Sequence, residues 1–300
     1  MAVAAPSRDT EETYKKVLAE NEIPIDVEKF DGYSLCWIGP RTAKAVILFM
    51  HGGGLTDPAF DAHIQFNLNG WKVMKANSQD VSIAVLAYGI APKTPYPVQN
   101  RQVVATIHHL LRSRPAEDIT LSGDSIGGML TLSTLLHHKH PIPTVPALTL
   151  PTLTSRFREI FIVSPGCSVI TDTKSMQENL GKDWLTHDMM RKGLETLTAS
   201  KEPGIEFPNP WFLSVSAEET WWKDLPVGHM TITVGGNELF RDEVLTVGER
   251  IKKYHDREVT VLCEEGGVHC GPFFALMMGA TDDDKSGTKL FKQWFQDFKA

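Results

Sequence analysis

The hydrophobic residues of this chain fall into two patterns that recur in turn along its length. Short runs of consecutive apolar residues predict buried strands, and the clearest of them is Ala45–Met50. Further strands are predicted at residues 82–87, 119–122, 160–164, 229–234 and 258–263, and helices at residues 11–20, 98–113, 127–137, 242–254 and 289–298. Strands that alternate with helices in this way predict an α/β fold with a mainly parallel central sheet flanked by helices.

One stretch, residues 175–226, interrupts this alternation. It is rich in Trp, Met and Pro and shows no clear strand pattern. We expect this stretch, together with about residues 1–30, to form a cap over the carboxyl ends of the strands. The remainder reads as one domain, so the whole chain, residues 1–300, is predicted to be a single capped domain.

Composition and charge exclude several classes of protein. The chain is 42% hydrophobic and 22% charged, with a net charge of −7 and no run of Lys or Arg, which argues against a nucleic-acid-binding protein. No segment approaches the roughly 20 apolar residues of a membrane span, and the first residues lack the basic region of a signal peptide. The four cysteines show no C-x-x-C pairing, so we expect reduced thiols, no metal site and a cytoplasmic location.

The strongest chemical signal lies between a predicted strand and a predicted helix. Residues 121–128 read Leu-Ser-Gly-Asp-Ser-Ile-Gly-Gly, which contains G-x-S-x-G in the strand–turn–helix context of a nucleophile elbow. A serine on such a tight turn needs very small neighbours two residues before and after it, and Gly123 and Gly127 meet that requirement. We therefore predict that Ser125 is a catalytic nucleophile.

A glycine-rich segment, His51-Gly52-Gly53-Gly54, follows directly after the first buried strand. Consecutive glycines allow backbone N–H groups to face a ligand, and acyl transfer needs such donors where the carbonyl oxygen becomes negative. We assign Gly53 and Gly54, with the N–H of Ile126, to an oxyanion hole. His51 is interpreted as a structural residue of this loop, because elbow enzymes place their base late in the chain.

These motifs together resemble the hormone-sensitive-lipase family of α/β-hydrolase-fold esterases. H-G-G-G stands some seventy residues before G-D-S-x-G-G, and residues 87–97 between them are similar to that family's Y-R-L-A-P-x-x-P-[FY]-P segment. Gly89 replaces the usual Arg, and Ile126 the usual Ala. The resemblance runs from about residue 47 to residue 271, and it implies a role for Asp124 in orienting nearby loops.

The same resemblance and the chain order Ser, acid, His point to the rest of a catalytic triad. After Ser125, only His269 lies in a loop that follows a predicted strand near the end of the chain. The family pattern G-x-D-x-L-R-D-E aligns without a gap with residues 236–243, which places Glu238 where the family has its catalytic aspartate. Asp242 stays open as a reserve acid, although an acid in the first turn of a helix also has an electrostatic explanation.

We expect hydrolysis of a small to medium apolar ester through an acyl-enzyme, with no cofactor, no membrane partner and no nucleic acid. A homodimer is compatible with the sequence. The pocket walls are expected to come from five apolar residues: Leu55, Trp184, Trp211, Phe240 and Phe273.

Two other functions remain open from the sequence. The same fold can catalyse acyl transfer, a retro-aldol or a cyclisation step, and family members with Glu as the acid resemble those of fungal small-molecule biosynthesis, or secondary metabolism. A receptor that binds a small molecule without turnover is a further alternative. Such receptors resemble this chain but have lost the histidine that is present here as His269.

Overall fold

The computed structural model describes residues 8–152, 154–169, 171–279 and 286–300. In this part of the chain one sheet of eight strands has the order β1-β2-β4-β3-β5-β6-β7-β8. The strands are β1 (Asp26–Phe30), β2 (Tyr33–Ile38), β3 (Ala45–Met50), β4 (Val81–Ala87), β5 (Ile119–Asp124), β6 (Phe157–Val163), β7 (Val227–Gly235) and β8 (Val259–Glu264). The hairpin β1–β2 and the pair β2–β4 are antiparallel, and all pairs from β4 to β8 are parallel.

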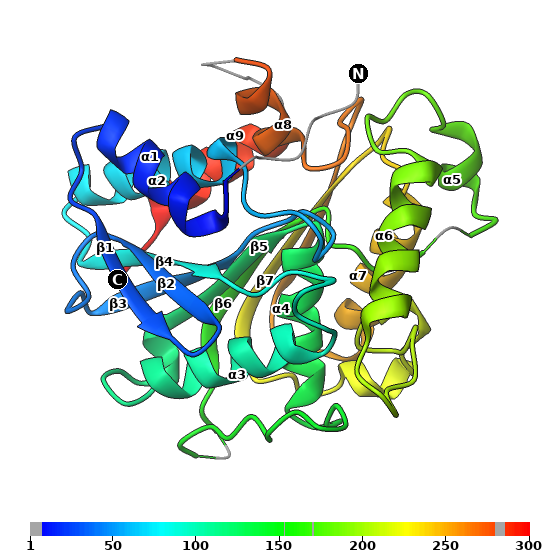
Figure 1. The fold of residues 1–300 in the computed structure, drawn as a ribbon, viewed down its shortest axis with the longest axis horizontal. Helices are drawn as coiled ribbons and strands as arrows, with labels where there is room; N and C mark the ends of the chain where they lie inside the picture. Colours follow the sequence, from blue (N-terminus) through cyan, green and yellow to red (C-terminus); the bar gives the residue numbers. More distant parts are fainter. Residues whose placement is uncertain (1–7, 153, 170, 280–285) are drawn as a thin grey trace.

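Helices cover both faces of this sheet (Figure 1). Helices α1 (Thr10–Glu20), α2 (Asp61–Ala76), α8 (Gly271–Met277) and α9 (Ser286–Asp297) pack together on one face, and α3 (Val98–Leu110), α4 (Ile126–His137) and α7 (Arg241–Tyr254) lie on the other. Two short or peripheral helices, α5 (Lys174–Glu178) and α6 (His187–Ser200), lie between β6 and β7 in the chain. The predicted α/β architecture with a mainly parallel, two-sided sheet is confirmed.

The strand β3 shows how the sheet separates two hydrophobic cores. Val46, Leu48 and Met50 point into the core under α3, α4 and α7, while Ile47 and Phe49 point into the core under α1, α2 and α9. Side chains of a strand alternate between its faces, so a strand with both faces covered buries apolar residues at consecutive positions. This explains the uninterrupted apolar run that made β3 the clearest strand in the sequence.

The segment expected to form the cap contains structure that its sequence pattern did not indicate. It holds α5 and the fourteen-residue helix α6. The other expected part of the cap, about residues 1–30, includes residues 1–7, which lie outside the described residues. Its described helix α1 packs on α2 and β2. No helix in the described ranges is long and apolar enough to cross a membrane.

Candidate active site

Ser125 occupies a tight turn between β5 and α4. Its backbone angles, φ 50° and ψ −120°, are strained for a residue other than glycine. A side chain at either neighbouring glycine would collide with the carbonyl oxygen of Met50, because a Cβ would lie 2.5 Å from it at Gly123 and 1.9 Å from it at Gly127. Glycine at both positions therefore allows the turn that carries Ser125 to pack directly against the end of β3.

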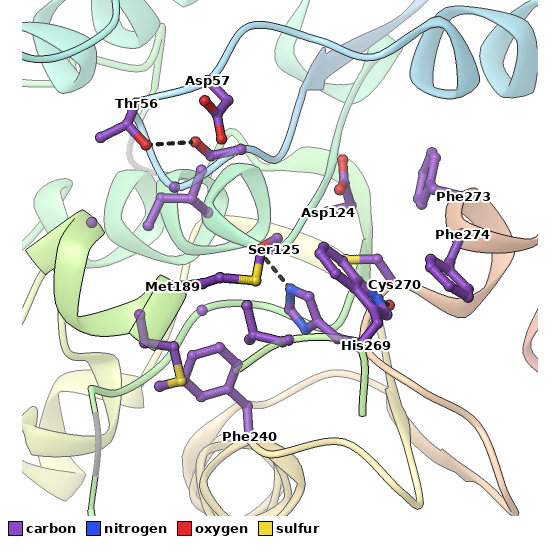
Figure 2. Close-up of a pocket in the computed structure, with 18 of the residues that line it drawn as sticks. Thr56, Asp57, Asp124, Ser125, Met189, Phe240, His269, Cys270, Phe273 and Phe274 are labelled. Carbon is purple, nitrogen blue, oxygen red and sulfur yellow. Dashed lines mark hydrogen bonds between the residues drawn. The ribbon is translucent and has the colours of Figure 1, made fainter. Parts of the chain in front are cut away.

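Three side chains that are distant in the sequence meet at this turn. The Nε2 atom of His269 lies 2.8 Å from the Oγ atom of Ser125 (Figure 2). Its Nδ1 atom lies 2.7 Å from Oε1 of Glu238. A carboxylate only accepts hydrogen bonds, so Nδ1 carries the proton and Nε2 is free to accept one from the serine. The structure thus brings together the three residues that were predicted as a triad.

Glu238 is fixed through its second carboxylate oxygen. Its Oε2 atom accepts hydrogen bonds from the Ser164 hydroxyl at 2.8 Å and from the backbone N–H of Gly235 at 2.9 Å. The Ser164 oxygen also accepts the backbone N–H of Cys270, the residue after the histidine, at 3.0 Å. Ser164, which ends a predicted strand, therefore joins the acid and the histidine loop, a role that sequence reasoning missed.

The charge around the imidazole favours its protonated form. Burial by itself lowers the pKa of His269, whose side chain is almost fully enclosed. The charge and hydrogen bond of Glu238 outweigh this effect, with contributions from Asp183 and Asp124, so the pKa of His269 lies above its ordinary value. A histidine in this setting is a stronger base towards the serine hydroxyl than a free imidazole.

The reserve acid Asp242 lies elsewhere. Its carboxylate accepts the backbone N–H of Ser175 at 2.8 Å and pairs with Arg241, at the first turn of α7. Of the two acids left open by the sequence, the structure brings only Glu238 to His269. Asp242 instead attaches the segment around α5 to α7.

The predicted oxyanion donors face the same space as the serine. Gly53 and Gly54 have φ angles of 105° and 64°, and Ile126 is the first residue of α4. Within the described residues their N–H groups have no acceptor. The preceding residue, Gly52, donates its N–H to Oδ1 of Asp124 at 2.9 Å. The glycine loop is thereby held beside the elbow.

Two buried histidines support this loop from behind. Oδ2 of Asp124 lies 3.1 Å from Nε2 of His63, whose Nδ1 accepts the N–H of Phe60. His51 is stacked on Tyr88 and donates from Nδ1 to the Gly52 carbonyl at 2.6 Å. Burial lowers the pKa of His51 to about 3, so it is neutral and structural at neutral pH.

A largely apolar cavity of about 200 Å³ opens above Ser125 and His269. Three of the expected wall residues, Trp184, Phe240 and Phe273, line it. Helix α6 supplies much of the rest of the wall, and Figure 2 shows Met189 reaching towards the serine. The apolar residues that the sequence did not assign to the pocket include Val169, Met189, Met190, Leu194, Leu197 and Phe212.

Two of the expected wall residues were assigned wrongly. Leu55 has a positive φ of 62°, is fully buried in the core, and its carbonyl accepts the N–H of Ala91. Trp211 packs against Trp221 and donates its indole N–H to the carbonyl of His140 at 2.7 Å. Neither side chain lines the cavity.

The histidines at the end of α4 are bound to the protein's own backbone. In the histidine cluster at the end of α4, ring nitrogens of His137 and His138 bond the carbonyls of Pro146 and Leu148. In the part of the chain that the structure describes, no three His, Cys, Asp or Glu side chains are placed to hold a metal ion.

The chain matches a known protein family and two fungal relatives. A family model described as alpha/beta hydrolase fold matches residues 47–273. The chain is 26% identical over 281 residues to "Putative steryl acetyl hydrolase mug81" of Schizosaccharomyces pombe, covering 86% of this chain and 70% of that protein. It is 22% identical over 259 residues to "Steryl acetyl hydrolase 1" of Saccharomyces cerevisiae, covering 77% of this chain and 55% of that protein.

A solved structure gives the same overall picture. The hormone-sensitive lipase from a metagenome library superimposes on this chain with a TM-score of 0.71 at 21% identity, over 98% of this chain and 92% of that one. At this level of identity the likeness concerns the fold.

Proposed function

Because the chain belongs to the α/β-hydrolase fold family, we propose that it hydrolyses carboxylic esters through an acyl-enzyme on Ser125. The observation that carries this proposal is the continuous hydrogen-bonded series from Ser125 through His269 to Glu238 at the base of an apolar cavity. A nucleophile, a base and a group that orients the base, in contact with each other, are the requirement for acyl transfer.

In the first half-reaction the Ser125 oxygen attacks the ester carbonyl while Nε2 of His269 takes the hydroxyl proton. The carbonyl oxygen becomes negative and binds the N–H groups of Gly53, Gly54 and Ile126, for which the described residues offer no competing acceptor. Glu238 offsets the positive charge on the imidazolium. His269 then passes its proton to the leaving alcohol oxygen as the tetrahedral intermediate collapses to the acyl-enzyme.

The second half-reaction repeats these steps with water. His269 removes a proton from a water molecule, the hydroxide attacks the acyl carbonyl, and the same N–H groups bind the oxyanion. Collapse of this intermediate returns the proton from His269 to the Ser125 oxygen and releases the acid. The N–H of Gly52 plays no part, because Asp124 holds it.

The substrate we propose is an ester of a short acyl group, acetyl above all, with an apolar alcohol such as a sterol. Two features support this choice. The cavity walls are dominated by Met, Leu and aromatic side chains, and two relatives carry steryl acetyl hydrolase names. Nothing in the site or the comparisons favours the non-hydrolytic alternative or a receptor.

We also propose a reducing, cytoplasmic setting. All four cysteines are free, and Cys36, Cys167 and Cys270 are buried. A role in small-molecule biosynthesis and a homodimeric state stay predictions from the sequence.

The proposal is tested with 4-nitrophenyl esters from acetate to decanoate and with a steryl acetate, on the wild-type protein and Ser125→Ala. We expect the highest kcat/KM for short acyl chains, release of acetate from the steryl ester, and loss of both activities in the variant. A fluorophosphonate should label the wild type on Ser125. Ester hydrolysis that persists in Ser125→Ala would contradict the assignment.

A further inference from the structure

Two consecutive side chains of the segment between α5 and α6 bind the backbone of His269. Oδ1 of Asp183 accepts the N–H of His269 at 3.0 Å, and the indole N–H of Trp184 donates to the His269 carbonyl at 2.6 Å. Both backbone polar groups of the proposed base are therefore held by side chains from the cap segment. Asp183 is buried, with 7% of its surface exposed.

The same short segment also binds the backbone around the proposed acid. The second oxygen of Asp183, Oδ2, accepts the N–H of Leu239 at 2.9 Å, so one carboxylate connects the histidine loop to the residue after Glu238. Four residues before Asp183 in the sequence, the side-chain amide of Asn179 donates to the Glu238 carbonyl at 2.9 Å. Residues 179–184 thus hold the main chain on both sides of the Glu238–His269 hydrogen bond.

This binding is continuous with the pocket wall. The Trp184 ring stacks on Phe274 with centroids 5.6 Å apart and lies 5.8 Å from the His269 ring. Thr186 then caps α6, whose side chains line the cavity. Helix α6, which supplies part of the cavity wall, begins at His187, shortly after Trp184 in the chain. Figure 1 shows α6 after α5 along the chain.

We propose that Asp183 and Trp184 are positioning residues that fix the backbone of His269, and through Leu239 that of Glu238, in the geometry of proton transfer. This inference rests on the proposed ester hydrolysis. Small displacements of a catalytic group lower turnover strongly, because the rate depends on alignment of the reacting atoms. The carboxylates that face the imidazole are Glu238 from the loop after β7, Asp183, and Asp124 at the end of β5.

The first test compares Asp183→Asn with Asp188→Asn. Asparagine keeps the shape but turns an N–H group towards the N–H of either Leu239 or His269, whereas Asp188 is an exposed residue that pairs with Arg191 on α6. We expect kcat on a short-chain ester to fall about 10- to 100-fold in Asp183→Asn with KM changed less than about threefold. Asp188→Asn removes the same charge from the adjoining helix and should retain wild-type kcat.

The second readout does not depend on turnover. In ¹⁵N-histidine-labelled protein, with the His269 signals assigned by their absence from His269→Gln, the pKa of His269 should be lower in Asp183→Asn than in wild type. Loss of a nearby negative charge disfavours the imidazolium, and we expect a downward shift of roughly 0.5 unit or more. If the wild type shows no Ser125-dependent hydrolysis, the proposed function fails while this titration still tests the contact.

Trp184→Phe keeps the proposal falsifiable if Asp183→Asn does not fold. Phenylalanine retains an aromatic ring against Phe274, although a smaller one, and removes the N–H that binds the His269 carbonyl. We expect kcat to fall roughly three- to tenfold. Unchanged kcat in a folded Asp183→Asn, or in Trp184→Phe where the first variant is unfolded, would overturn the proposal. An unshifted His269 pKa in folded Asp183→Asn would do the same.

Discussion

A side chain at Gly127 would place its Cβ 1.9 Å from the carbonyl oxygen of Met50, so the first turn of α4 lies directly against the end of β3. Neither residue can move easily, because Met50 is fully buried at the end of a central strand and Gly127 is buried in α4. The glycine loop follows directly after Met50. The contact fixes the distance between the nucleophile and the proposed oxyanion donors. It also leads to the first prediction.

Gly127→Ala should be strongly destabilising, by more than about 3 kcal/mol, because it forces backbone displacement in the core. The matched control is Gly193→Ala in α6, where an added Cβ meets nothing within 4 Å. There the change should stabilise the protein by up to about 1 kcal/mol through helix propensity. Chemical denaturation of both variants measures the difference. Equal stabilities would show that the elbow tolerates a methyl group.

Glu238→Gln should lower kcat/KM by roughly 10²- to 10⁴-fold, because the amide leaves the imidazole free to adopt the wrong tautomer and removes the compensating charge. Asp242→Asn should cost less than about tenfold, since Asp242 contacts Ser175 and Arg241 and not His269. Both variants are assayed on one short-chain ester. A dead Asp242→Asn beside a nearly normal Glu238→Gln would reverse the assignment of the acid.

The pH dependence of kcat/KM should show an acid limb with an apparent pKa above the ordinary histidine value of about 6.5. Only neutral His269 can accept the Ser125 proton, so the rate falls about tenfold per pH unit below its pKa. Burial lowers the pKa of His269, but Glu238 and the other carboxylates raise it by more than burial lowers it. Initial rates on a neutral ester from pH 5 to 9 give the value. A limb centred well below pH 6 would contradict this electrostatic description.

Asp57 should disfavour negatively charged substrates. Its carboxylate lines the cavity, burial raises its pKa, and no hydrogen-bond donor among the described residues reaches it. We compare 4-nitrophenyl hemisuccinate with the neutral pentanoate ester. The ratio of kcat/KM for the anionic over the neutral ester should rise about three- to tenfold in Asp57→Asn, because a like charge is removed. An unchanged ratio would show that the anionic group does not approach Asp57.

The elements that the sequence predicted well are those whose residue pattern is required by burial on both faces or by close backbone packing. Strands β3 and β4 place apolar side chains in both cores, and the turn at Ser125 requires glycine on both sides. The resemblance inferred from these motifs is confirmed at the level of family and fold. The hydrogen bonds of His269 to Ser125 and Glu238 agree with the predicted triad, while its catalytic role stays a prediction.

The missed elements lack such signals. The hairpin β1–β2 lies at the edge of the sheet, where β1 is only half-buried and shows little apolar contrast. Helix α2 was not predicted, because Asn67, Asn69 and Gly70 interrupt its middle and lower its helix propensity. In the cap segment, the surroundings of a side chain depend on contacts with distant loops. The sequence therefore could not distinguish Trp184, which lines the cavity, from Trp211, which does not.

The boundary at Thr186 has a practical consequence for engineering. Residues before it contact the proposed base and acid, whereas α6 after it contributes side chains to the cavity. A chimera that imports α6 from a homologue should therefore cross over at Thr186 and retain this chain's own Asn179, Asp183 and Trp184. A graft that begins before Thr186 would replace both the cavity wall and the residues that hold His269. A graft that begins at Thr186 would replace the cavity wall of α6 alone, so substrate selectivity could be changed without disturbing His269.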